Sequence, residues 1–242
     1  MLPLLEEVTQ AWLIEHITSA SPIAASRWGD GEWRAVLQAA NGKMPRGQSR
    51  FQNCDKHRFF PAMNSRLFRI LQSDPPYLLG FQKFSWGLYS KQIEKFSNRY
   101  LPSRRWFQAS IFSRAALRGE FGKFLAAIRD RPNLFVGPNY LRGLDRYVRI
   151  DKFVEVPRQN CFLELQRIVD EAAEAASQLP PGSLVSISAS MPANIIVDRL
   201  FHRLDNRYIV LDMGSVYDPF VGVQTRTQHT KWQLKQNLSW LS

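Results

Sequence analysis

The chain has 242 residues, of which 45% are hydrophobic and 12% aromatic, a length and composition typical of a globular protein with a sizeable core. It has no run of 18 apolar residues and no basic start, so we expect neither a transmembrane segment nor a secretion signal. Cys54 and Cys161 form neither a CxxC pair nor a zinc pattern, which predicts a reducing, cytoplasmic location.

Strands and helices are predicted to alternate along the chain. Apolar residues at helical spacing predict helices within 1–17 and at 31–40, 60–72, 89–99, 114–129, 160–178 and 192–204. Short buried runs predict strands at 22–28, 77–80, 133–137, 153–156, 183–190 and 208–212, and a long loop is predicted at 41–57. This alternation predicts an α/β fold, a single Rossmann-like domain over 1–242 with a mostly parallel sheet and helices on both faces.

The positive charge of the chain is concentrated in one segment. Residues 41–131 hold 18 Lys and Arg against 5 Asp and Glu, so their net charge of +13 exceeds the +11 of the whole chain. Aromatic residues are interleaved with these cations, which is typical of surfaces that bind polyanions, nucleic acid included. A solvated basic face around an ordinary core is the alternative interpretation.

The most informative motif is SRWGDGEW, at the end of the first predicted strand. Asp30 and Glu32 are separated by one residue, a spacing at which two carboxylates can share a hard divalent cation. Gly29 and Gly31 allow a sharp turn close to a ligand, and Arg27 offers a planar fork for phosphate or carboxylate. The motif suggests a nucleoside diphosphate site with a metal. A polar turn at a helix N-terminus, where acidic residues are favoured, is the alternative.

Other polar residues follow later strands, at the edge where parallel sheets bind ligands. Ser190 can cap a helix that starts near Pro192, and the free N–H groups of such a terminus attract phosphate. Asp212 precedes a glycine turn and can bind a sugar hydroxyl or activate an acceptor, and Gly137 ends another strand. An ordinary capped helix and a turn-forming aspartate are the alternatives. The sequence has no P-loop, dinucleotide-binding, zinc-protease or nucleophile-elbow motif.

Six segments, in this order along about residues 21–221, resemble the motifs of the GT-D-type glycosyltransferases. They are SRWGDGE, FSR at 112–114, LFVG at 134–137, VPRQNCF at 156–162, SISASMPANIIVDRL and IVLDMGSVYDPF. The family typically shows an RFGDGE turn, an SRP segment, a strand ending in glycine, P-x-x-N-A-F, a GP-T-A strand–helix junction and I-D-x-G-H. The chain departs from this pattern at Ala115, at Ser190 and Met191 within the junction, and at Ser215 in place of histidine.

The resemblance implies a GT-D-type Rossmann-like sheet and a nucleoside diphosphate sugar donor, more specifically a UDP-sugar. It implies that Asp30 and Glu32 form a D-x-E motif whose Mn²⁺ or Mg²⁺ ion bridges the donor diphosphate. Carried over residue by residue, it makes site candidates of Arg27, Arg114, Asn160, Ser190 and Asp212, to which we add Gly29, Gly31, Gly137 and Asn194 as donor-binding residues. Asp212 or Asp218 is the candidate catalytic base for the acceptor hydroxyl.

The basic segment predicts a polyanionic acceptor, such as DNA with hydroxymethylated bases, which an enzyme must flip out of the duplex. The candidate acceptor contacts are Arg46, Arg50, Trp86, Arg104 and Arg105. Peripheral contact with an anionic membrane surface is also open. The alternatives are a glycosyltransferase for a bacterial surface glycan or glycoprotein and, from another class, a nucleotide- or nucleic-acid-binding module without catalysis. The intact D-x-E turn argues against the last of these.

Overall fold

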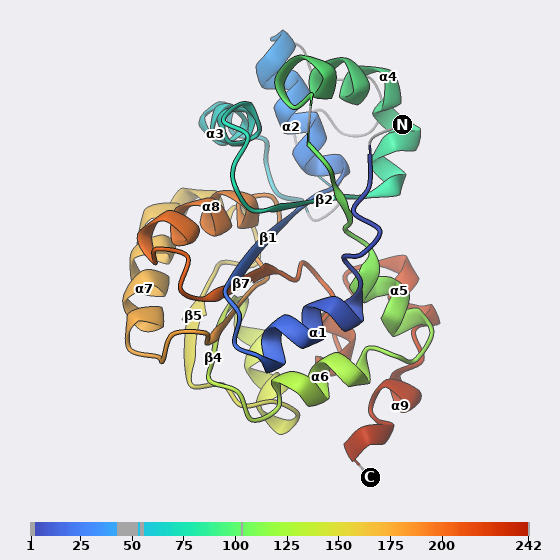
Figure 1. The fold of residues 1–242 in the computed structure, drawn as a ribbon, viewed down its shortest axis with the longest axis vertical. Helices are drawn as coiled ribbons and strands as arrows, with labels where there is room; N and C mark the ends of the chain where they lie inside the picture. Colours follow the sequence, from blue (N-terminus) through green and yellow to red (C-terminus); the bar gives the residue numbers. More distant parts are fainter. Residues whose placement is uncertain (1–2, 43–52, 54–55, 103, 242) are drawn as a thin grey trace.

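The computed structural model describes residues 3–42, 53, 56–102 and 104–241, with only the backbone described at 83–86 and 88 (Figure 1). Within this part of the chain, seven strands form one sheet in the order β3-β2-β1-β7-β6-β4-β5, and all paired neighbours are parallel. The strands are β1 (Ile23–Trp28), β2 (Leu78–Phe81), β3 (Phe107–Gln108), β4 (Asn133–Gly137), β5 (Lys152–Glu155), β6 (Leu184–Ile187) and β7 (Ile209–Asp212). The predicted α/β class is confirmed.

The connections make the first and last strands neighbours at the centre of the sheet. The chain moves outward from β1 to β2 and β3, then crosses to β4 in the other half and returns to β7. β4, β6 and β7 are buried at every position, which fits their largely apolar sequences, because helices cover both faces of such sheets. In the register of β1 with β7, Ala25 pairs with Leu211, so the ends of the two strands lie together.

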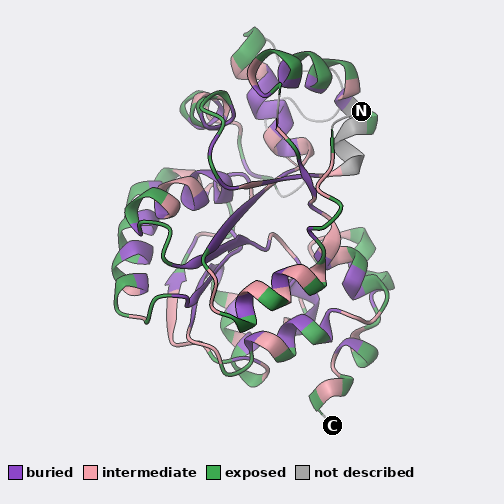
Figure 2. Ribbon diagram, viewed as in Figure 1, coloured by how far each residue is buried: buried purple, intermediate pink, exposed green. Residues whose placement is uncertain are grey.

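Helices cover both faces of the sheet and enclose two cores. One core lies under α2 (Asp30–Asn41), α3 (Pro61–Gln72), α4 (Lys83–Tyr100), α7 (Leu165–Ser177) and α8 (Ala193–Arg203). The other lies under α1 (Gln10–Thr18), α5 (Ile111–Leu117) and α6 (Gly122–Ile128). Figure 1 shows α7 and α8 on one side of the sheet and α1 and α6 on the other, and Figure 2 shows their buried sides turned toward it.

Two buried tryptophans bracket the turn between β1 and α2. Trp28 ends β1, Trp33 lies in the first turns of α2, and their ring centroids are 6.4 Å apart. Trp33 also packs against Trp106 and Phe81, at 5.8 Å and 6.4 Å between centroids. The turn is therefore anchored at both ends by the core. Several aromatic residues of the basic segment 41–131 belong to this core and not to a binding surface.

Some elements differ from their predicted bounds. The predicted helix 114–129 is two helices, because the chain turns at Gly119, whose φ is +76°. The predicted helix 160–178 begins with a 3₁₀ turn, η2 (Cys161–Glu164), before α7. α4 begins at Lys83 and is kinked at Tyr89, near the start of the predicted helix. β3 was not predicted, because its two residues are too few to show a period.

The remaining elements are short and lie mainly after β7. η1 (Asn139–Arg146) follows β4, and the end of the chain forms η3 (Asp218–Val221), η4 (Thr227–Lys231), α9 (Leu234–Asn237) and η5 (Ser239–Leu241). In the described part of the chain, every helix is too short or too polar to cross a membrane.

Asn237 joins the C-terminal segment to the α5–α6 junction. Its buried side chain accepts a hydrogen bond from the Phe121 amide (2.7 Å) and donates to the carbonyl oxygen of Ala116 (2.8 Å). We expect Asn237→Ala to lower the free energy of unfolding by about 1–3 kcal/mol, since buried backbone groups lose their partners. Chemical denaturation measures this, with Lys235→Ala on the exposed side of α9 as a control expected within about 0.5 kcal/mol of wild type. Equal stability of the two variants would contradict the anchoring role.

Candidate active site

A cavity of about 790 Å³ opens at the carboxyl ends of the strands. Each of the seven described strands contributes a residue at or just beyond its end: Arg27, Gln82, Ala109, Pro138, Val156, Ser188 and Asp212. Because the paired strands are parallel, these ends meet at one edge of the sheet, where ligands of such sheets bind. The cavity therefore lies where the sequence places the candidate site.

The D-x-E turn forms one wall of the cavity. Asp30 and Glu32 lie half-buried in the first turn of α2, and the Gly29 amide donates to Glu32 Oε2 at 2.9 Å. Gly29 lies close to two side chains of the wall, since a Cβ there would lie 2.7 Å from Gln82 Oε1 and 3.0 Å from Glu32 Oε2. The turn is both a helix cap and a carboxylate pair, so the two interpretations of the motif describe one structure.

Burial, with smaller contributions from the negative charges of Asp30 and Asp212, raises the pKa of Glu32 to about 7. The repulsion between these carboxylates favours a bound cation, which relieves it. The described residues contain no group of three or more His, Cys, Asp or Glu that could hold a metal ion. A pair of carboxylates fits Mg²⁺ or Mn²⁺ when substrate phosphates and water complete the ligand set, which is the usual arrangement for Mg²⁺.

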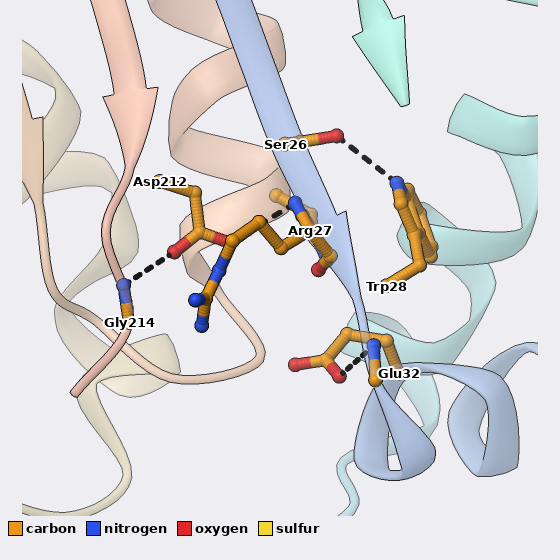
Figure 3. Close-up of polar contacts among 8 residues, drawn as sticks. Ser26, Arg27, Trp28, Glu32, Asp212 and Gly214 are labelled. Atoms are coloured by element: carbon orange, nitrogen blue, oxygen red, sulfur yellow. Dashed lines mark hydrogen bonds and ion pairs between the residues drawn. The ribbon is translucent and has the colours of Figure 1, made fainter. Parts of the chain in front are cut away.

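Asp212, the last residue of β7, holds Arg27 at the end of β1 (Figure 3). Asp212 Oδ2 accepts a hydrogen bond from the Arg27 amide at 3.1 Å and lies 3.7 Å from Arg27 Nε, while Oδ1 accepts from the Gly214 amide at 2.9 Å. Burial raises the pKa of Asp212, and the Arg27 charge opposes that rise. The guanidinium lies against the Cα of Gly214, where a Cβ would come within 1.8 Å of Nη2. Arg27 is thereby fixed on the cavity wall beside the D-x-E turn.

α8 also contacts the carboxyl end of β1. Asn194 is fully buried and donates from Nδ2 to the Arg27 carbonyl oxygen at 3.1 Å, outside the described lining of the cavity. Ser190 does line the cavity, with φ of +53°, and its hydroxyl oxygen accepts a hydrogen bond from Asn53 Nδ2 at 3.1 Å. The predicted strand–helix junction therefore contributes Ser190 to the cavity wall and Asn194 to the support of Arg27.

Besides Asn194, three predicted donor-binding residues lie outside the described lining. Asn160, with φ of +57°, donates from its amide to His57 Nδ1 at 3.1 Å and thus orients a residue of the wall. Burial lowers the pKa of His57 to about 4, so this imidazole is neutral at pH 7. Gly137 is buried against Leu141, and Arg114 is exposed on α5.

Arg104 and Arg105 are predicted to contact the acceptor, but both bind other parts of the protein. Arg104 donates from Nε to Asp74 at 2.7 Å and from Nη1 to the Tyr77 carbonyl oxygen, and Arg105 donates to the Leu4 carbonyl oxygen at 3.0 Å. Both lie outside the described lining of the cavity. The other predicted acceptor contacts lie outside the part of the chain that the structure describes; they are Arg46, Arg50 and the side chain of Trp86.

The wall also includes the cations Lys56, Arg158 and Arg226. Lys56 lies in the predicted loop of the basic segment, where acceptor contacts are expected, whereas Arg158 and Arg226 were missed by the sequence reasoning. Asp218, which was predicted, also lines the cavity, with Tyr140 beside it. Arg158 had a positional signal, because it lies two residues after a predicted strand, whereas Arg226 lies well beyond the last predicted strand and had none.

Solved structures of a domain of unknown function, DUF1792, resemble this chain, and that domain is described as having a distinct glycosyltransferase fold. One matches with a TM-score of 0.64 at 16% identity, covering 90% of this chain and 80% of that chain. A selenomethionine-substituted structure of DUF1792 matches with a TM-score of 0.59 at 17% identity and the same coverage. Comparisons with protein-family models and with curated proteins give no match. The chain therefore has a glycosyltransferase fold, in agreement with the GT-D-type resemblance of its motifs.

Gly214 and Gly222 provide a matched test of how firmly Arg27 is held. Both have positive φ, +55° and +76°, but a Cβ at Gly222 would meet no described atom within 4 Å. We expect Gly222→Ala to cost about 1 kcal/mol of stability, the strain of a left-handed residue. Gly214→Ala should cost about 2 kcal/mol or more, because Arg27 must also move. Urea denaturation measures both, and equal losses would mean that the guanidinium is free to move.

Proposed function

We propose that this protein is a metal-dependent glycosyltransferase that moves a sugar from a nucleoside diphosphate sugar, UDP-linked, to an acceptor hydroxyl. The observation that carries the proposal is that Asp30, Glu32 and Arg27 border one cavity at the ends of the strands. The glycosyltransferase fold supports the same reaction class. A nucleotide-binding module without catalysis would not need a carboxylate pair and a buried aspartate in one cavity.

The residues of the site fit the charge changes of sugar transfer. When bound by Asp30 and Glu32, Mn²⁺ or Mg²⁺ would neutralise the diphosphate and stabilise the charge that develops on the leaving group. Arg27 contributes a fixed positive charge for the same diphosphate, because Asp212 and Gly214 restrain its side chain. The N-terminus of α2 adds the partial positive charge of its free amides.

Removal of either D-x-E carboxylate tests the metal and the donor together. We expect calorimetry to detect UDP binding in the presence of Mn²⁺, and a chelator to weaken it. Asp30→Ala and Glu32→Ala should each abolish this cation-dependent binding with the fold intact, because both residues lie on a half-buried turn. Glu174→Ala, on the exposed side of α7, is the control and should bind as wild type does. UDP binding that ignores the chelator would overturn the metal assignment.

The acceptor we propose is polyanionic, and DNA with hydroxymethylated bases is one such acceptor. The support is the net charge of +13 in residues 41–131, together with the cations Lys56, Arg158 and Arg226 on the cavity wall. The burial of aromatic residues such as Trp106 and the structural pairing of Arg104 reduce the surface available to nucleic acid. A bacterial surface glycan or glycoprotein is the alternative acceptor class.

The salt dependence of binding distinguishes these acceptors. If DNA is the acceptor, affinity for a duplex should fall steeply with salt, because phosphate contacts release counterions. Arg46→Gln with Arg50→Gln should lower the slope of log affinity against log salt by about two units. Lys152→Gln with Lys235→Gln, outside the basic segment, should leave the slope unchanged. If wild type binds no DNA at low salt, the acceptor is a glycan or a membrane-associated molecule instead.

A further inference from the structure

Two aspartates besides the D-x-E pair border the cavity, and their surroundings give them different chemistry. Asp212 uses both carboxylate oxygens to hold the main chain, since Oδ2 accepts from the Arg27 amide and Oδ1 from the Gly214 amide. Its charge is also paired with the Arg27 guanidinium. A proton taken up by Asp212 would weaken all three contacts, so Asp212 is suited to positioning Arg27 and poorly suited to accepting a proton.

Asp218 is held by side-chain hydroxyls. Tyr140 Oη lies 3.1 Å from Oδ1, and the Thr225 hydroxyl donates to Oδ2. Asp218 is the first residue of η3, is 2% exposed, and lines the cavity together with Tyr140, Thr225 and Arg158. Each carboxylate oxygen can accept more than one hydrogen bond, so an acceptor hydroxyl in the cavity can join these contacts without breaking them.

The charges around Asp218 favour a group that is ionised but ready to accept a proton. Burial raises its pKa to about 6, and the hydroxyls of Thr225 and Tyr140 and the positive charge of Arg158 limit that rise. Burial and the charge of Asp218 raise the pKa of Tyr140 above its ordinary value, so its hydroxyl remains a donor. The Arg158 guanidinium lies over the Tyr140 ring, 5.4 Å from its centroid, and brings a positive charge to the same wall.

We propose that Asp218 is the catalytic base of the transfer, and that Asp212 is the positioning residue for Arg27. This assignment rests on the proposed function. The Asp218 carboxylate takes the proton of the acceptor hydroxyl as the acceptor oxygen bonds to the anomeric carbon. The bond from that carbon to the diphosphate oxygen breaks, and its electron pair leaves with the nucleoside diphosphate. The proton on Asp218 then passes to solvent, so the carboxylate is restored.

The test uses donor hydrolysis, in which water replaces the acceptor. Release of UDP is measured from UDP-glucose, UDP-galactose and UDP-N-acetylglucosamine with Mn²⁺, beside calorimetry of UDP. We expect Asp218→Asn to slow UDP release about 100-fold or more, the usual effect of losing a general base, while UDP binds as tightly as to wild type. Asp145→Asn, an exposed change on η1, should leave both unchanged.

The pH profile separates a base from a structural residue. In wild type, the rate of UDP release should fall as the pH drops below about 6, because Asp218 becomes protonated. This decrease at acid pH should be absent in Asp218→Asn. Tyr140→Phe removes a hydrogen-bond donor that lowers the pKa of Asp218, so the decrease in UDP release should begin at a higher pH in this variant. Normal UDP release by Asp218→Asn would overturn the assignment of Asp218 as the base and leave the proposed function standing. Failure of wild type to bind UDP would overturn both this assignment and the proposed function.

Discussion

The contact between Arg27 and Asp212 is the constraint on which the site depends. It joins the carboxyl ends of the first and last strands of the sheet, which are neighbours at its centre. Asp212 fixes the backbone amide of Arg27 as well as its guanidinium, and Asn194 fixes the carbonyl of the same residue from α8. These contacts, together with the packing of Trp28 and Trp33 at either end of the turn, hold the D-x-E turn in place.

The cavity is lined by both negative and positive groups. The D-x-E turn contributes Asp30 and Glu32, and Lys56, Arg158 and Arg226 contribute positive charge. Glu32 and Asp218 both have raised pKa values because burial disfavours their ionised forms. Such carboxylates cost stability, and the cation and proton uptake that we propose would relieve that cost.

Much of the fold and part of the site could be predicted from the sequence. Alternating strands and helices gave the parallel sheet, and strand ends placed Arg27, Ser190 and Asp212 on one cavity, because parallel strands share an edge. The short strand β3 and the helix break at Gly119 leave no periodic signal. Composition could not separate Arg104, which binds backbone carbonyls, from a cation that faces a ligand.

The part of the cavity wall formed by residues after β7 shows a second limit of prediction from the sequence. Thr225 and Arg226 follow the last predicted strand in a segment of short 3₁₀ turns, so neither apolar period nor strand position points to them. Tyr140 lies in η1, more than seventy residues from Asp218, and their hydrogen bond depends on how two loops meet above the sheet. Contacts between loops arise from the tertiary structure and are not encoded in a local pattern.

The most direct test of the central claim is release of nucleoside diphosphate from a panel of UDP-, GDP-, CDP- and ADP-sugars, measured with Mn²⁺, with Mg²⁺ and with a chelator. We expect release from UDP-sugars that requires a divalent cation and stops in the chelator. Release that proceeds equally in the chelator, or a wild-type protein that neither binds nor cleaves any member of the panel, would contradict it.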